Sequence, residues 1–135
     1  LSPSAAGTNT DTIVFGGTTG SLTGATEIWN GTNWTETHNL NTARYQLAGT
    51  GLSSTDAVVF GGLTPSVTAV TEEFNGSGWT EVADLSTARG AMQGSGNSTT
   101  AALAAGGENA STSALTATEE WQGAGANTTR EFDLS

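Results

Sequence analysis

The stretch Val59-Phe60-Gly61-Gly62 opens a series of four landmarks in the middle of this chain. The other three follow in order as Thr71-Glu72-Glu73-Phe74-Asn75-Gly76, Trp79-Thr80-Glu81 and Leu85-Ser86-Thr87-Ala88-Arg89. Together they combine an apolar run closed by paired glycines, a short segment with glutamate and an aromatic residue, a tryptophan and an arginine. Apolar runs of this length, bounded by Gly and Asn-Gly, are typical of β-strands.

The same series occurs again on both sides of this stretch. Phe15-Gly16-Gly17 precedes Phe60-Gly61-Gly62 by 45 residues, and Ala105-Gly106-Gly107 follows it at the same interval. The repeat positions with polar or aromatic side chains are Glu27, Glu72 and Glu119, Trp34 and Trp79, and Arg44 and Arg89. The third unit contains a short insertion and has threonine where the later tryptophan is expected. We therefore interpret the chain as two full repeats and a diverged third.

The length of the repeat predicts the architecture. Four short strands in a unit of roughly 40 to 50 residues are typical of a β-propeller blade. We predict a single all-β domain of three four-stranded antiparallel blades, 1–40, 41–86 and 87–135, each of about 45 residues. A helical repeat is excluded, since no unit has apolar residues at helical spacing. Three blades are fewer than the four to eight of a closed ring, so we expect a longer chain or an oligomer.

Strands are expected at the apolar or alternating segments of each unit. Residues 1–10 contain Pro3 and would make a poor central strand. The predicted strands are 11–15, 25–29 and 32–37 in the first unit, 44–51, 56–60, 69–74 and 79–82 in the second, and 89–96, 100–105, 117–121 and 127–132 in the third. Asn30-Gly31 and Asn75-Gly76 predict hairpin turns.

The composition leaves two classes of protein open. Only 35% of the 135 residues are hydrophobic, and the chain is rich in Thr, Ser, Gly and Ala. A composition of this kind fits either a soluble β-repeat protein or a disordered linker. Tryptophan and phenylalanine recur at strand-like positions, whereas disordered segments are poor in aromatic residues. The ordered β protein is therefore favoured.

The charge and the missing residue types argue against several functions. The net charge is −10, there is no lysine, and the three cations Arg44, Arg89 and Arg130 are scattered, which disfavours binding to nucleic acid. No apolar run approaches the roughly 20 residues that cross a membrane as a helix, so membrane insertion is not expected. The absence of Cys excludes disulfides and fits a virion surface or another extracellular setting. The chain opens at Leu1 without a leader, so we expect any signal peptide to have been removed or never to have been there.

The repeated glycines, glutamates and arginines are predicted to be structural. Gly16-Gly17, Gly61-Gly62 and Gly106-Gly107 are weighed as phosphate-binding loops and as strand ends with positive φ. No lysine or helix follows them, which favours strand ends. Because Arg44 and Arg89 share one phase of the repeat, each is expected to bond to a carboxylate or to carbonyl groups of a neighbouring strand.

The aromatic residues have two possible roles, as core residues or as a platform for stacking on sugars. Trp34 and Trp79 occupy the same repeat position and are predicted to pack in the core, with a partner for each indole N–H. Trp29 and Trp121 alternate with Phe74 at another position, and both roles stay open for them.

No catalytic, cofactor or metal site is predicted. His38 has no Ser, Asp or metal-ligand companions at useful spacing and is expected to face solvent. Asp11 and Asp56 each stand four residues before a Phe-Gly-Gly, where they would offer oxygens to Ca²⁺, but no calcium-loop spacing accompanies them.

The repeat resembles the kelch motif of kelch β-propellers. The likeness rests on the apolar run with paired glycines, the Glu-aromatic strand, the Trp and the Arg that opens the next unit, and it covers nearly the whole chain. The Thr-rich repeat sequence, which contains no Cys or Lys, is similar to kelch-like arrays of marine bacteriophages. Kelch-like folds include copper radical oxidases, whose chemistry needs a Tyr linked to Cys and His ligands. With Tyr45, His38 and no Cys, this chain does not carry that chemistry over.

These observations predict a structural or binding module without enzymatic activity. The resemblance implies a virion protein, such as a capsid decoration, fibre or tail adsorption protein, which contacts itself or other virion subunits. The alternative is a secreted bacterial adhesin or carbohydrate-binding propeller, whose loops 18–24, 63–68 and 108–116 contact a cell-surface glycan. A hydrolase or oxidase is disfavoured because acid and base residues do not converge.

Overall fold

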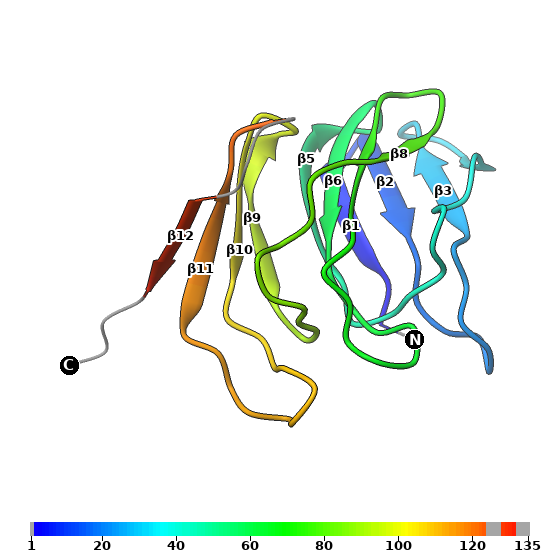
Figure 1. Cartoon of the computed structure of the whole chain (residues 1–135). Helices are drawn as coiled ribbons and strands as arrows, with labels where there is room; N and C mark the ends of the chain where they lie inside the picture. The colour runs from blue at the N-terminus through cyan, green and yellow to red at the C-terminus, as the bar shows by residue number, and fades with distance from the viewer. Residues whose placement is uncertain (1, 124–127, 132–135) are drawn as a thin grey trace.

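Three antiparallel sheets of four strands each make up the fold (Figure 1). The computed structural model describes residues 2–123 and 128–131, the last four by their backbone alone. In this part of the chain every regular element is a strand, so none of it forms a helix that could cross a membrane. The predicted all-β class and the three four-stranded antiparallel units are confirmed, and the three sheets do not close into a ring.

Each sheet is a meander in which consecutive strands pair. The first sheet consists of β1 (Ser4–Thr8), β2 (Asp11–Phe15), β3 (Thr26–Trp29) and β4 (Trp34–Glu36). The second consists of β5 (Ala48–Ser53), β6 (Asp56–Phe60), β7 (Thr71–Phe74) and β8 (Trp79–Glu81). The third consists of β9 (Gln93–Ser98), β10 (Ala101–Ala105), β11 (Ala117–Trp121) and β12 (Thr128–Glu131). The first strands of the sheets, β1, β5 and β9, lie next to one another, so the sheets stand side by side in chain order.

Most strands begin and end within about two residues of their predicted limits, but two predictions are wrong. Strands were expected at 44–51 and 89–96, whereas β5 and β9 begin four residues later in each case. Gln46 and Ala91 have φ values of 51° and 53°, in the left-handed region, and there the chain bends out of the extended path. The residues just before the bend therefore lie in the connections between sheets.

The Asn-Gly pairs open loops of four residues rather than two-residue hairpins. Trp29 pairs with Trp34 across the loop 30–33, and the Asn30 side-chain oxygen accepts hydrogen bonds from the backbone N–H groups of Thr32 (3.0 Å) and Asn33 (2.9 Å). The second sheet has the same arrangement at Asn75. An asparagine that holds its own turn in this way explains why Asn precedes each glycine.

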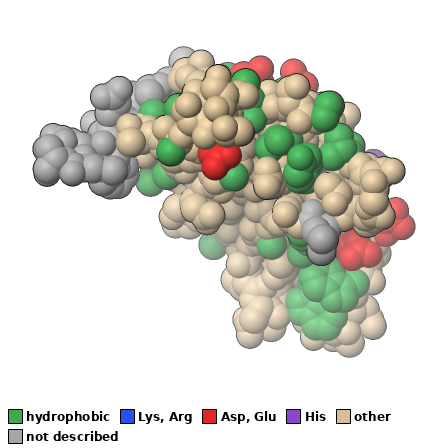
Figure 2. Space-filling model, turned by 90° about the horizontal axis from the view of Figure 1, so that it is seen from below, with side chains coloured by type: hydrophobic (Ala, Val, Ile, Leu, Met, Phe, Trp, Pro, Cys, Tyr) green, Lys and Arg blue, Asp and Glu red, His purple; other side chains and the backbone are tan. Residues whose placement is uncertain are grey.

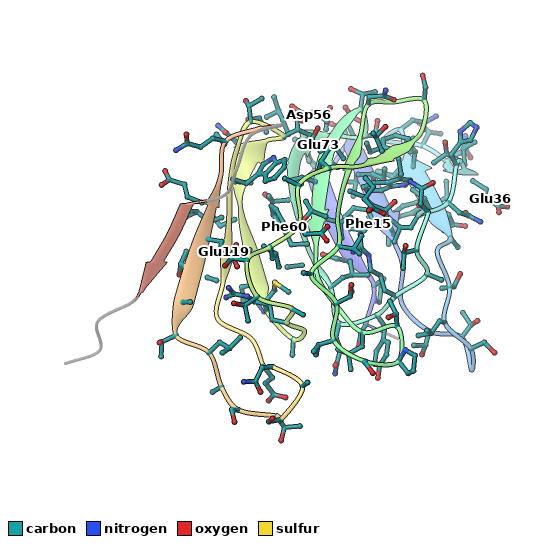
Figure 3. The ribbon with its side chains drawn as sticks, in the orientation of Figure 1. Phe15, Glu36, Asp56, Phe60, Glu73 and Glu119 are labelled. Atoms are coloured by element: carbon teal, nitrogen blue, oxygen red, sulfur yellow. The ribbon has the colours of Figure 1, made fainter. Side chains whose placement is uncertain are left out.

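Two apolar layers hold the sheets together. Between the first and second sheets, Phe15 meets Trp79 edge to face with ring centroids 5.0 Å apart. Between the second and third sheets, Phe60 meets Trp121 at 6.3 Å in the same geometry. Alternate residues of β6, with Val59 on one side and Phe60 on the other, belong to the two layers. The middle sheet is therefore covered on both faces, and Figure 3 shows Phe15 and Phe60 in the interior.

Candidate functional site

The connection before the second sheet is tied to that sheet by a buried ion pair. Arg44 and Glu72 are both fully buried, with 3.0 Å between guanidinium Nη2 and carboxylate Oε1. Arg44 also donates through Nη1 to the carbonyl of Val70. Burial lowers the pKa of Arg44 below its ordinary value, and the nearby carboxylates, Glu72 first, oppose this effect. Both kinds of partner predicted for this arginine, carboxylate and strand carbonyl, are present.

Glu72 also binds the chain that precedes Arg44. Its Oε2 accepts hydrogen bonds from the backbone N–H of Asn41 (2.8 Å) and from the Asn41 side-chain amide (2.9 Å). Its Oε1 accepts the backbone N–H of Thr42 at 3.3 Å. The segment Leu40-Asn41-Thr42-Ala43-Arg44 therefore wraps around one carboxylate. Sequence reasoning missed this role of the backbone, although the constant spacing of the segment was its signal.

The third sheet is tied down in the same way. Arg89 Nη2 lies 2.5 Å from Glu119 Oε1, and both side chains are buried. Arg89 donates further hydrogen bonds to the carbonyls of Gly106 (3.2 Å) and Ala117 (2.7 Å). The backbone N–H of Ser86 donates to Glu119 Oε2 at 2.7 Å. The arginine–glutamate pair and the backbone N–H bond to the second carboxylate oxygen thus occur at both interfaces, where they join neighbouring sheets.

Glu27 occupies the same repeat position in the first sheet but lies in a different environment. Its residue is exposed, whereas Glu72 and Glu119 are buried. Both arginines with described side chains, Arg44 and Arg89, are committed to those other two glutamates. Among the described residues, no arginine pairs with Glu27 as Arg44 and Arg89 pair with Glu72 and Glu119.

The paired glycines end their strands with positive φ, as predicted. All six, Gly16, Gly17, Gly61, Gly62, Gly106 and Gly107, have φ between 52° and 104°. Gly62 shows why a larger residue is excluded, because a Cβ there would lie 2.8 Å from the carbonyl oxygen of Tyr45. The Gly62 N–H donates to the carbonyl of Arg89 at 2.9 Å. Gly17 and Gly62 thus bring their strand ends against the connection that leads to the next sheet.

Trp79 is in the core, as predicted, whereas the same prediction for Trp34 is wrong. Trp79 is 7% exposed and donates its indole N–H to the Thr26 hydroxyl of the first sheet at 3.1 Å. Trp34 is 51% exposed. The cause is position, since Trp79 points from the second sheet toward the first, and no sheet in the described chain lies on the corresponding face of the first sheet.

Trp29 and Trp121 separate in a similar way. Trp121 is 1% exposed, and its indole N–H lies between the Thr99 carbonyl (2.7 Å) and Glu73 Oε1 (3.0 Å). Trp29 is only partly buried and donates to the carbonyl of Asn9 at 3.1 Å. Its ring lies 5.4 Å from that of Trp34. Two tryptophans are therefore grouped on the outer side of the first sheet.

Asp11 and Asp56 each accept a hydrogen bond from the sheet that follows in the chain. Asp11 accepts the backbone N–H of Ser54 at 3.1 Å, and Asp56 accepts that of Thr99 at 2.8 Å. Among the described residues no three His, Asp or Glu side chains gather as metal ligands do. Each aspartate thus links its sheet to the first hairpin of the following one.

Two further polar residues lie outside these networks. Glu73 lies at the same end of the molecule as Asp56, as Figure 3 shows. Burial raises the pKa of Glu73 above its ordinary value, the hydrogen bond from Trp121 lowers it, and the charge of Asp56 raises it. His38 is exposed, as predicted, beside Glu36 and Thr37.

A groove lies between the loops at the opposite end of the second and third sheets. It has a volume of about 240 Å³ and is lined by the loops around Pro65 and Asn109. Gln46 and Ala91, the two left-handed residues of the connections, form part of its wall. Seen from this end, the molecule shows hydrophobic and acidic side chains and no Lys or Arg among the described residues (Figure 2).

The described lining of this loop groove contains few ionisable side chains. Glu108 is the single ionisable residue among the described lining residues, and the other polar side chains are the amides of Gln46 and Asn109 and the hydroxyls of Ser66 and Thr112. Glycoside hydrolysis ordinarily uses two carboxyl groups, and nucleophilic catalysis needs a nucleophile with an adjacent base. Apolar surface with a few amide and carboxylate groups is suited to a neutral polar ligand.

The comparisons with known proteins support the fold alone. No protein-family model matches this sequence, and neither does any curated protein. Among solved structures, the one titled "Structure of YjhT" is similar, with a TM-score of 0.77 and 13% sequence identity. The match covers 97% of this chain and 45% of the other, so this chain spans less than half of that structure.

Proposed function

We propose that this chain is a segment of a kelch-like β-propeller that acts as a structural and binding module without enzymatic activity. The observation that carries the proposal is the repetition of one set of bonds at both sheet interfaces, Arg44 to Glu72 and Arg89 to Glu119. The adjacent first strands, β1, β5 and β9, support a radial arrangement of the sheets. In this proposal the repeated polar residues serve assembly, and the exposed loops and outer faces serve binding.

The proposed place of action is the surface of a bacteriophage virion, as a capsid decoration, fibre or tail adsorption protein. The acidic chain without Lys or Cys supports an extracellular setting, in which neither nucleic acid nor a lipid bilayer is the partner. Its proposed partners are further copies of itself or other virion subunits.

Quantitative mass spectrometry of purified virions tests this proposal. The virions come from the phage whose genome encodes the chain, and the host-cell fraction is measured in parallel. We expect a stoichiometric amount of the chain in intact particles. This amount should be retained after the particles are treated with nuclease and washed in buffer without protease. Finding the chain only in the cell or in the medium would contradict the virion assignment.

A second candidate function is carbohydrate binding by a secreted adhesin. It is favoured by the loop groove, where Pro65 and Leu63 adjoin Glu108 and Asn109. The test is a glycan array with the wild-type chain and the variants Glu108→Gln and Asn109→Ala. Binding that both variants weaken and that Leu52→Ala, a change at an exposed position of β5, leaves intact would support this candidate.

A further inference from the structure

The two outer sheets present unequal halves of the same kind of interface. On the first sheet, Trp34 and Trp29 lie on the face that corresponds to the Trp79 face of the second sheet. On the third sheet, Leu103 is 40% exposed at the repeat position of Val58, which is fully buried against its neighbouring sheet. The outer face of the third sheet therefore resembles the face of the second sheet on which the following sheet packs. The outer face of the first sheet resembles the face of the second sheet that packs on the preceding sheet.

A buried hydroxyl on the third sheet supplies an independent sign of a missing partner. Thr118 is 8% exposed, and its Oγ1 has no hydrogen-bond partner among the described residues. Thr118 pairs with Ala105 in β10, as Thr26 pairs with Phe15 in β2, so the two threonines are equivalent. The Thr26 hydroxyl accepts the indole N–H of Trp79. Because an unpaired buried hydroxyl costs free energy, Thr118 stands where an indole donor is expected.

We propose that two copies of this chain associate head to tail, with the outer face of the third sheet of each copy on the outer face of the first sheet of the other. Trp34 of one copy takes the place that Trp79 has inside the chain, and its indole N–H donates to Thr118 of the second copy. Leu103 packs beside it, as Val58 packs inside the chain. Both contacts occur twice, related by a two-fold axis, as in a dimer with a self-complementary interface.

The size of the resulting particle agrees with what sheets of this kind form. Two copies contribute six sheets, within the range of four to eight that closes a ring. The matching solved structure is more than twice as long as the part that this chain covers, since the chain spans 45% of it. A second copy supplies the complement of about that size. The closed dimer rests on the propeller architecture proposed above and is independent of a virion location.

Charge sets the conditions under which the dimer forms. Each copy has a net charge of −10, so the two copies repel each other at low ionic strength. Salt near the physiological level screens charges more than about 8 Å apart, and it therefore favours association. Glu27 faces the new interface, and no arginine among the described residues pairs with it as Arg44 and Arg89 pair with Glu72 and Glu119, so we expect this contact to be weaker than the two interfaces inside the chain.

Molar mass measured by light scattering and native mass spectrometry over a concentration series tests the proposal. The expected result is a species of twice 13.5 kDa that increases with protein and salt concentration. Trp34→Ala and Leu103→Glu are each expected to weaken it at least about tenfold, which is about 1.4 kcal/mol. Leu52→Ala is the control, because Leu52 is 58% exposed but belongs to the middle sheet.

Mixing the two variants distinguishes head-to-tail association from other dimers. A mixture of Trp34→Ala and Leu103→Glu chains contains one intact contact in each mixed dimer, so dimerisation is expected to recover in part. Circular dichroism and urea unfolding of each variant at low concentration verify that the folded chain is retained.

Each of the following results would overturn the proposal. They are a chain that stays monomeric at all salt and protein concentrations, a dimer that is insensitive to Trp34 and Leu103, and open polymers in place of a closed dimer. A monomer that bound glycans through Trp34 would also overturn it. None of these results decides whether the chain occurs in virions, so failure here is separate from failure of the proposed function.

Discussion

Glu72 and Trp79 of the second sheet differ sharply from Glu27 and Trp34 of the first, although the sequence places them at the same positions of the repeat. The first pair is buried and bonded to residues outside its own sheet, and the second pair is exposed. The local strands are alike, since both sheets have the same order and the same register at these positions. The difference therefore lies in the neighbour, and identical residues contribute to stability only where an adjoining sheet covers them.

The largest difference is expected between Glu72→Ala and Glu27→Ala. Removing Glu72 leaves the buried Arg44 guanidinium without its carboxylate and two backbone N–H groups without their acceptor, and breaking a buried pair in this way costs about 3–5 kcal/mol. Glu27→Ala changes an exposed side chain and is expected to alter the free energy of unfolding by less than about 0.5 kcal/mol. Urea unfolding of both variants measures this, and equal losses would contradict the comparison.

Trp79→Phe is expected to cost about 2 kcal/mol of stability. The change keeps an aromatic ring against Phe15 but removes the indole N–H, so the buried Thr26 hydroxyl loses its donor and keeps only its own bond to the carbonyl of Gly24. Trp34→Phe is the matched control and should be nearly neutral, at protein concentrations where the chain is monomeric. Thermal unfolding at several protein concentrations separates this effect from association, and a destabilised Trp34→Phe monomer would argue against the exposed position of that ring.

Asp56→Ala is expected to cost about 1 kcal/mol, because the backbone N–H of Thr99 loses its charged acceptor. The third sheet has Ala101 at the corresponding position, so this unit has no carboxylate there to accept a backbone N–H. Hydrogen exchange of the Thr99 amide measures the loss directly. Faster exchange confined to the hairpin between β9 and β10 is the expected pattern, and unchanged protection would refute it.

The smallest effect is expected from Glu73→Gln, and it has the opposite sign. Burial raises the pKa of Glu73 in the folded chain, so ionised Glu73 disfavours folding, and stability falls as pH rises from the unfolded pKa through the raised folded one. Glutamine keeps an acceptor for Trp121 without the charge. The variant should therefore unfold at a higher temperature than wild type at pH 7, and the difference should vanish in acid. The first sheet has Ile28 at this position, and no such pH dependence is expected from this uncharged side chain.

The repeat predicted the strands and their grouping because period-2 alternation and paired glycines are local signals. It predicted the partners of Arg44 and Arg89 because two cations at one phase of an acidic chain have few other roles. The repeat did not predict that Asn41 and Thr42 would share the Glu72 carboxylate. Almost every residue type has a backbone N–H, so the sequence does not show which of these groups forms a bond.

Trp34 shows where the sequence argument stops. A repeat position states which face a side chain belongs to, but burial depends on whether another sheet lies on that face. The late start of β5 and β9 was missed for a related reason. Gln46 and Ala91 adopt a left-handed backbone that these residue types rarely take, so only the packing of the connections specifies it.

The segment that closes around Glu72 belongs to the connection that leaves the preceding sheet, and this offset determines what can be duplicated. We call this segment, residues 40–44, the latch of the sheet. A gene segment that encoded residues 48–81 alone would copy a sheet without its latch. A copy of residues 40–84 would carry latch and sheet together and could be inserted between existing units with its bonds satisfied on both sides. Arrays of this kind are therefore expected to grow and shrink in steps of one 45-residue period, with breakpoints beside the leucine that opens each latch.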